Sequence, residues 1–215
     1  RLRAGSRNGG RVLAARAGTA WLPQPRRGEF AYVTVLWSGD YVDCAISWAT
    51  GLIEVSSSFR RICLVARGGV SEGLLVLLEE CCCEVVPVDP IHSRRTVGKG
   101  QWSRYELALT KLRVLQLDGH GLRKVVLMDS DTLVLENIDE LFWLPAPAAS
   151  LTRTTLLGEA EQPSLSSGVL VLEPSQSEFD AVLGRLRDWE ASAGEEEVLR
   201  FIEQDLLSLH WMAGG

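Results

Sequence analysis

Two aspartates, Asp129 and Asp131, stand directly after a short apolar run at 124–128 (KVVLM). A nearly continuous apolar run of this length predicts a strand that is buried on both faces. In an extended segment alternate side chains project the same way, so both carboxylates could reach one ion. Two carboxylates completed by water and phosphate oxygens form an all-oxygen site that suits Mg²⁺ or Mn²⁺ rather than zinc. Asp129 and Asp131 are therefore candidate metal ligands, and the alternative is a turn or helix cap built from Asp and Ser.

The elements that would position these aspartates alternate between short β-rich runs and longer stretches of helical periodicity. Runs rich in β-branched and aromatic residues predict strands at 31–36, 61–66, 83–88, 124–128 and 168–172. Apolar residues at helical spacing predict helices at 41–53, 71–80, 103–116, 178–189 and 195–209. Strands separated by helices imply an α/β fold with a mainly parallel sheet flanked by helices. In such a sheet ligands bind at the carboxyl ends of the strands, where the strand order reverses.

The composition and charge of the 215 residues suit one packed domain preceded by a tail. Hydrophobic residues make up 46% of the chain, which is enough for a sizeable core. Residues 1–30 contain seven Arg and one Glu, whereas the whole chain has a net charge of -6. We therefore expect a basic flexible tail at 1–30, either a transit-type segment or a linker, and a folded domain at 31–215. The acidic domain has no basic stripe, which argues against nucleic-acid binding.

No run of this sequence reaches the roughly 18–20 apolar residues that a membrane span requires. The sequence shows no anchor, and it leaves the cytoplasm, a plastid and the Golgi lumen open as locations. The five cysteines are an odd number, and three of them are consecutive at 81–83. Adjacent strand residues point to opposite faces, so this triplet does not suit a tetrahedral zinc site. Reduced thiols packed beside the strand at 83–88 are expected.

Five blocks of the sequence, in order, resemble glycosyltransferase family 8, the glycogenin-like enzymes. The central block is 123–142 (RKVVLMDSDTLVLENIDELF), in which a strand ends in the two aspartates and an NIDELF-type helix start follows. The other four blocks are 31–35 (AYVTV) with Tyr41 beyond it, 109–112 (LTKL), 165–169 (LSSGV) continuing to 173–175 (EPS), and 203–207 (EQDLL). The resemblance covers roughly residues 30 to 210, and it implies a GT-A-type, Rossmann-like fold.

The resemblance implies a retaining hexosyltransferase that uses a uridine diphosphate (UDP) sugar and depends on Mn²⁺, or Mg²⁺, held by Asp129 and Asp131. A divalent ion stabilises the negative charge that develops on the departing phosphate. The resemblance assigns Lys111 to the diphosphate or sugar, where its charge would add electrostatic stabilisation. It places Glu203 and Gln204 under the anomeric carbon. Without the resemblance, Lys111 is a solvated lysine on an amphipathic helix, and Glu203 and Gln204 form an exposed helix face.

The same resemblance implies a set of donor-binding residues around the two aspartates. Tyr41 would lie against the uracil, although a tyrosine there is also compatible with core packing. Glycine permits close approach of backbone to a ligand, and an ordinary turn into a strand is the alternative for the 165–169 block. The substrate-binding residues implied in this way are Val35, Tyr41, Ser130, Ser166, Ser167 and Gly168.

The sequence departs from the family pattern at several places. Ser166 stands where the family has Asn, and Glu203 replaces a usual Asp. The family's third metal ligand is a histidine in an HxxGxxKPW-type segment near the C-terminus, and no such segment occurs here. We therefore expect the domain to be incomplete at its C-terminus. The acceptor is left open among glycan, small polyol, lipid and protein, and so is the oligomeric state.

Three other functions are weighed against this hypothesis. A sugar nucleotidyltransferase would carry a Gly-rich, Arg-containing phosphate loop after its first strand, and 36–41 (LWSGDY) does not provide one. A dinucleotide oxidoreductase would carry GxGxxG after a strand, and none is present. A catalytically inactive relative that binds a nucleotide sugar or a partner stays open, because the altered residues and the missing histidine segment are compatible with it.

Overall fold

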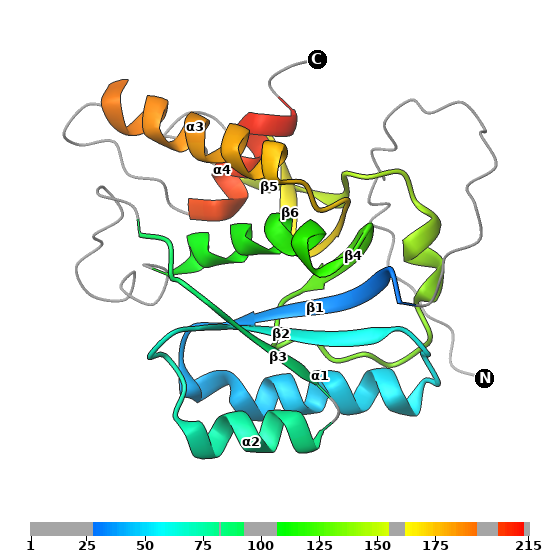
Figure 1. Ribbon diagram of the computed structural model, residues 1–215. Coiled ribbons are helices and arrows are strands. Elements are labelled where there is room, and N and C mark those ends of the chain that lie inside the picture. The colour runs from blue at the N-terminus through cyan, green and yellow to red at the C-terminus, as the bar shows by residue number, and fades with distance from the viewer. Residues whose placement is uncertain (1–27, 82, 93–106, 155–161, 193–201, 213–215) are drawn as a thin grey trace.

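The computed structural model describes residues 28–81, 83–92, 107–154, 162–192 and 202–212. Six strands form one sheet in the order β3-β2-β1-β4-β6-β5 (Figure 1). Strand β1 is parallel to both β2 and β4, and β2 is parallel to β3. Strand β6 is antiparallel to both of its neighbours. The strands are β1 (Phe30–Leu36), β2 (Arg60–Ala66), β3 (Glu84–Val88), β4 (Lys124–Met128), β5 (Ala148–Thr154) and β6 (Gln162–Leu172).

Helices cover both faces of the sheet (Figure 1). One face is covered by α1 (Val42–Glu54) and α2 (Glu72–Glu80). The opposite face is covered by η3 (Ala108–His120), α3 (Gln176–Ser192) and α4 (Ile202–Trp211). Two short 3₁₀ helices, η1 (Gly39–Tyr41) and η4 (Asp139–Trp143), follow β1 and the segment after β4. The predicted α/β fold with a mainly parallel sheet between two helical layers is confirmed.

Strand β1 shows how the sequence divides the interior into two cores. Its side chains alternate between the two faces of the sheet, as the pleat requires. Ala31, Val33 and Val35 pack in the core beneath η3, α3 and α4. Phe30 and Tyr32 pack in the other core, beneath α1 and α2. All of these side chains are buried, which explains why β1 is an unbroken apolar run.

The main difference from the expected strands lies at the antiparallel side of the sheet. Strand β5 was not predicted, and β6 begins six residues before the expected 168–172 run. The sequence 148–154 (AASLTRT) has few β-branched or aromatic residues, so local propensity gives a weak signal there. Strand β5 exists because it pairs with β6 at the sheet edge, with a register irregularity between Ala149 and Leu151.

Two predicted helices differ from the structure in their bounds. The helix expected at 103–116 is described from Ala108 as η3, a long 3₁₀ helix that continues to His120. It ends at Gly121, whose positive φ of 73° is a conformation that glycine adopts without strain. The helix expected at 195–209 is described from Ile202 as α4. The first residues of both predictions lie outside the described residues.

Cys44, Cys63 and Cys81 are free thiols, as expected. Cys63 and Cys83 are buried in the core beneath α1 and α2. Burial, together with the neighbouring Cys83, raises the pKa of the Cys63 thiol far above its ordinary value. Thiols that stay protonated are poor nucleophiles and poor metal ligands, so Cys63 has a packing role.

Helix length and polarity bear on membrane association. Within the described ranges, no helix combines the length and the apolar character needed to cross a bilayer. The longest α-helix, α3, has 17 residues and buries only one side, through Phe179, Val182 and Leu186.

A partly buried polar cluster anchors the segment that follows β4. The Tyr32 hydroxyl donates to Asp139 Oδ1 at 2.8 Å, and the Ser57 hydroxyl donates to the same oxygen at 2.7 Å. Asn137 Oδ1 accepts the Asp139 N–H at 3.0 Å, and its amide nitrogen donates to the Val55 carbonyl at 3.0 Å. Burial and then the Asp139 carboxylate raise the pKa of Tyr32 well above its ordinary value, so its hydroxyl remains a donor.

This cluster predicts that Tyr32→Phe lowers the free energy of unfolding by about 1.5–3 kcal/mol, as expected for a hydrogen bond to a charged group. The ring stays, so the packing against Phe142, whose centroid is 4.8 Å away, is retained. Urea denaturation followed by circular dichroism measures the change. If Tyr32→Phe unfolds at the wild-type midpoint with the wild-type slope, the cluster does not contribute to stability.

Candidate active site

A pocket of about 240 Å³ lies at the carboxyl ends of β1 and β4. From β1 the chain adds β2 and then β3 on one side of the sheet, and it then adds β4 on the other side of β1. The strand order therefore reverses between β1 and β4. This is the position at which open α/β sheets bind their ligands. The residues that line the pocket are Val35, Leu36, Trp37, Tyr41, Ala108, Lys111, Asp129, Ser130, Asp131 and Glu203.

The two aspartates lie in a turn and not in the extended segment that the sequence predicted. The N–H of Thr132 donates to the Asp129 carbonyl at 3.1 Å, which closes the turn directly after β4. The N–H of Asp129 donates to the Gly168 carbonyl at 2.9 Å, so the start of the turn is fixed to β6. The turn brings both Asp129 and Asp131 to the pocket wall, and Asp131 is exposed.

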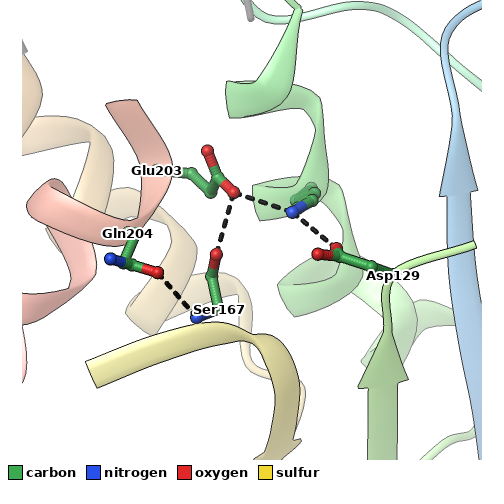
Figure 2. Close-up of polar contacts among 5 residues, drawn as sticks. Asp129, Ser167, Glu203 and Gln204 are labelled. Carbon is green, nitrogen blue, oxygen red and sulfur yellow. Dashed lines mark hydrogen bonds and ion pairs between the residues drawn. The ribbon is translucent and has the colours of Figure 1, made fainter. Parts of the chain in front are cut away.

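Lys111 connects three segments that are far apart in the sequence. Its ammonium Nζ lies 2.6 Å from Asp129 Oδ1 and 2.7 Å from Glu203 Oε1 (Figure 2). Lys111 comes from η3 and Glu203 from α4, and their residues are only 8% and 6% exposed. The alternative interpretations of these two residues as a solvated lysine and an exposed helix face are therefore wrong.

Burial and the neighbouring charges have opposite effects on the pKa values of Lys111 and Asp129. Burial lowers the pKa of Lys111, but the Glu203 and Asp129 carboxylates outweigh burial, and the pKa is raised above its ordinary value. Burial raises the pKa of Asp129, Lys111 lowers it, and the nearby Glu203 and Asp131 raise it again, so that the net direction is upward. The raised pKa of Asp129 indicates that one ammonium does not fully compensate the burial of this carboxylate and the acidic groups around it.

Ser167 joins β6 to α4 beside this cluster. Its hydroxyl donates to Glu203 Oε1 at 3.0 Å, and its N–H donates to Gln204 Oε1 at 3.3 Å (Figure 2). The Gln204 side chain therefore binds the backbone of Ser167, and it is not among the residues that line the pocket. Ser166, Ser167 and Gly168 also lie outside the lining, although a Cβ on Gly168 would stand 3.6 Å from Asp129 Oδ2.

Three residues of the pocket wall were not identified from the sequence: Leu36, Trp37 and Ala108. Trp37 directly follows β1, and its ring centroid lies 6.5 Å from that of Tyr41 at an interplanar angle of 52°. Its position after a strand's carboxyl end is a signal that the sequence already contained. Of the donor-binding residues predicted, Val35, Tyr41 and Ser130 do line the pocket.

Comparison with solved structures defines the class of fold. The chain superposes on a crystal structure of the galactosyltransferase LgtC in complex with donor and acceptor sugar analogs, with a TM-score of 0.53. The match covers 82% of this chain and 69% of LgtC at 15% sequence identity. The architecture is therefore the GT-A fold of glycosyltransferases, with the pocket at the switch point of the sheet.

Sequence relatives of the chain are glycosyltransferases of the same class. No family model matches the chain. The chain is 27% identical over 215 residues to galactinol synthase 1 of Solanum lycopersicum, a match that covers 91% of this chain and 64% of that protein. It is 31% identical over 159 residues to human glycogenin-1, covering 71% of this chain and 42% of glycogenin-1. These similarities support the resemblance of the chain to glycosyltransferase family 8. The chain spans less than two thirds of the length of either relative.

Proposed function

We propose that this protein transfers a hexose from a UDP-sugar to an acceptor with retention of the anomeric configuration, with Mn²⁺ or Mg²⁺ bound by Asp129 and Asp131. The observation that carries the proposal is one pocket that gathers Lys111, Asp129 and Asp131 at the switch point of a GT-A sheet. The similarity to galactinol synthase and glycogenin supports hexosyl transfer as the reaction. An inactive relative has no comparable support, because the acidic and basic groups that transfer requires stand together.

The donor set of the pocket fits a hard divalent cation. Asp129 Oδ1 is buried and receives no hydrogen bond of good geometry, so it retains capacity for a ligand besides its ion pair with Lys111. Asp131 is exposed beside it and unobstructed from the pocket. Among the residues described, no three His, Cys, Asp or Glu side chains are grouped to hold one ion. Water and the donor's phosphate oxygens would therefore complete the coordination, as is usual for Mg²⁺.

The ion would supply Lewis-acid stabilisation of the leaving diphosphate. Lys111 adds a fixed positive charge in a largely buried setting, where it counts for more than in water. Trp37 and Tyr41 both line the pocket and offer aromatic faces for the nucleobase.

Glu203 suits an electrostatic role better than a nucleophilic one. Its Oε1 already receives the Lys111 ammonium and the Ser167 hydroxyl, which withdraw charge from the carboxylate. Gln204 lies outside the pocket lining. These contacts favour retention through attack of the acceptor on the leaving-group side, with no covalent glycosyl-enzyme intermediate.

Donor turnover measured beside donor binding tests the proposal. With Mn²⁺ present, UDP should bind, and a UDP-hexose should release UDP by transfer or by slow hydrolysis with an α-configured product, detected by NMR of the anomeric proton. Chelation of the metal with EDTA should abolish both signals. Binding of UDP-hexoses without any release of UDP would instead favour the inactive, donor-binding relative, and an inverted product would refute retention.

A further inference from the structure

The pocket wall carries more negative than positive charge. Its described lining contains the carboxylates of Asp129, Asp131 and Glu203 and a single cation, the Lys111 ammonium. The ammonium is not placed toward the open pocket but between two of these carboxylates, at 2.6 Å and 2.7 Å. The one lysine of the described lining is thus engaged by the carboxylate that the metal would need.

A divalent cation bound to Asp129 would meet this ammonium as a like charge at close range. Charges a few ångströms apart in a partly buried site interact far more strongly than in bulk water. Asp129 Oδ1 is buried, and among the described residues it has no hydrogen-bond donor besides the Lys111 ammonium that could be exchanged instead. The ammonium and the metal therefore compete for Asp129.

The ammonium has a second attachment that does not depend on Asp129. Glu203 is 6% exposed, and its Oε1 is fixed by the Ser167 hydroxyl at 3.0 Å as well as by Lys111. An ammonium released from Asp129 would remain held at Glu203, beside the pocket, with donor protons free for another anion. A diphosphate in the pocket is the anion that could accept them.

We propose that Lys111 acts as a resident counter-cation of the metal site: it occupies Asp129 in the metal-free protein and transfers its ammonium contact to the donor diphosphate when the metal binds. The metal is then held weakly until the diphosphate arrives, and the two bind cooperatively. This inference rests on the proposed function, because it requires a metal and a diphosphate in the pocket.

Metal binding without donor is the first test, with Mn²⁺ alone as the probe and electron paramagnetic resonance of free Mn²⁺ as the measurement. Lys111→Met, which keeps the aliphatic chain and removes the competing charge, should bind Mn²⁺ about tenfold more tightly than wild type. The factor by which UDP strengthens Mn²⁺ binding should be smaller in this variant, as linkage requires. Arg113→Met, which removes a cation from the same helix without contact to either carboxylate, should bind Mn²⁺ like wild type. Unchanged or weaker Mn²⁺ binding by Lys111→Met would overturn the inference.

The small number of lysines allows a direct observation of the ammonium. The chain contains three, Lys99, Lys111 and Lys124. Lysine-selective ¹³C and ¹⁵N labelling therefore gives three side-chain signals, and Lys111→Met assigns one of them. Diamagnetic Mg²⁺ should shift the Lys111 signal, and UDP should shift it again. Lys124 does not line this pocket, and its ammonium donates to the Leu144 carbonyl at a distance of 2.8 Å. The Lys124 signal should therefore not shift, and it serves as an internal control.

Different results would contradict the proposed metal site and the proposed counter-cation role of Lys111. If Asp131→Asn leaves Mn²⁺ binding intact, the metal site itself is wrong and the proposed function loses its cofactor. If Asp131→Asn loses Mn²⁺ binding but the Lys111 signal is unmoved at saturating Mg²⁺, the metal site stands and the counter-cation role is wrong.

Discussion

Replacing Asp129 or Asp131 by asparagine is expected to abolish Mn²⁺-dependent binding of a UDP-sugar while the protein stays folded. Each change removes one of the two carboxylates proposed to hold the metal, and the third carboxylate of the described pocket lining, Glu203, is already engaged by Lys111 and Ser167. Isothermal titration with UDP-glucose in the presence and absence of Mn²⁺ measures the loss. Glu136→Gln, an exposed carboxylate on the segment after the turn, removes the same charge and should bind donor like wild type.

The stability of the Asp129→Asn variant without metal should equal or slightly exceed that of wild type at neutral pH. The pKa of Asp129 is raised in the folded protein, first by burial, so the folded state favours the protonated carboxyl. The stability associated with this group is present below its unfolded pKa and is lost as pH rises through the folded pKa. Asparagine cannot ionise, so the Asp129→Asn variant does not lose this stability at neutral pH. A large fall in metal-free melting temperature, or normal donor and metal binding in either variant, would contradict the assignment of Asp129 and Asp131 to the metal.

Replacing Lys111 by alanine is expected to slow hexosyl transfer by about 10²-fold or more at saturating donor, with a smaller effect on donor binding. This pattern marks an interaction that strengthens in the transition state, when charge builds on the leaving diphosphate. Lys111→Arg should rescue poorly, because its planar guanidinium does not reproduce a compact ammonium between Asp129 and Glu203. Single-turnover kinetics beside equilibrium donor binding separate the two effects. Equal transfer rates for Lys111→Ala and wild type at saturating donor would show that Lys111 has no role in catalysis.

Lys111→Ala should also destabilise the fold, which has to be separated from catalysis. The change leaves the buried Glu203 carboxylate without its cation, and breaking a buried pair in this way costs about 3–5 kcal/mol. The double variant Lys111→Met/Glu203→Gln removes both charges and should recover most of that stability. Its transfer rate should remain low. If stability and activity recover together, the slow rate of Lys111→Ala is a folding effect.

The sequence by itself determined the fold class and the position of the two candidate metal ligands. Apolar runs separated by helical periodicity are local signals, and they predicted β1, β2, β3 and β4 to within one residue at either end. The two aspartates could be found because they directly follow the buried strand β4. Lys111 and Glu203 were identified only through blocks shared with family 8, since nothing in their neighbouring residues sets them apart from an ordinary helix surface.

The tertiary structure alone decided how these residues are paired. That Lys111 contacts both Asp129 and Glu203 depends on η3, β4 and α4 meeting on one side of the sheet, and sequence spacing does not encode such long-range contacts. The same is true of β5, whose weak local propensity is overridden by pairing with β6. Gln204 stands next to Glu203 in sequence, but successive residues of a helix point about 100° apart. One therefore lines the pocket with its carboxylate, while the other holds the backbone of Ser167.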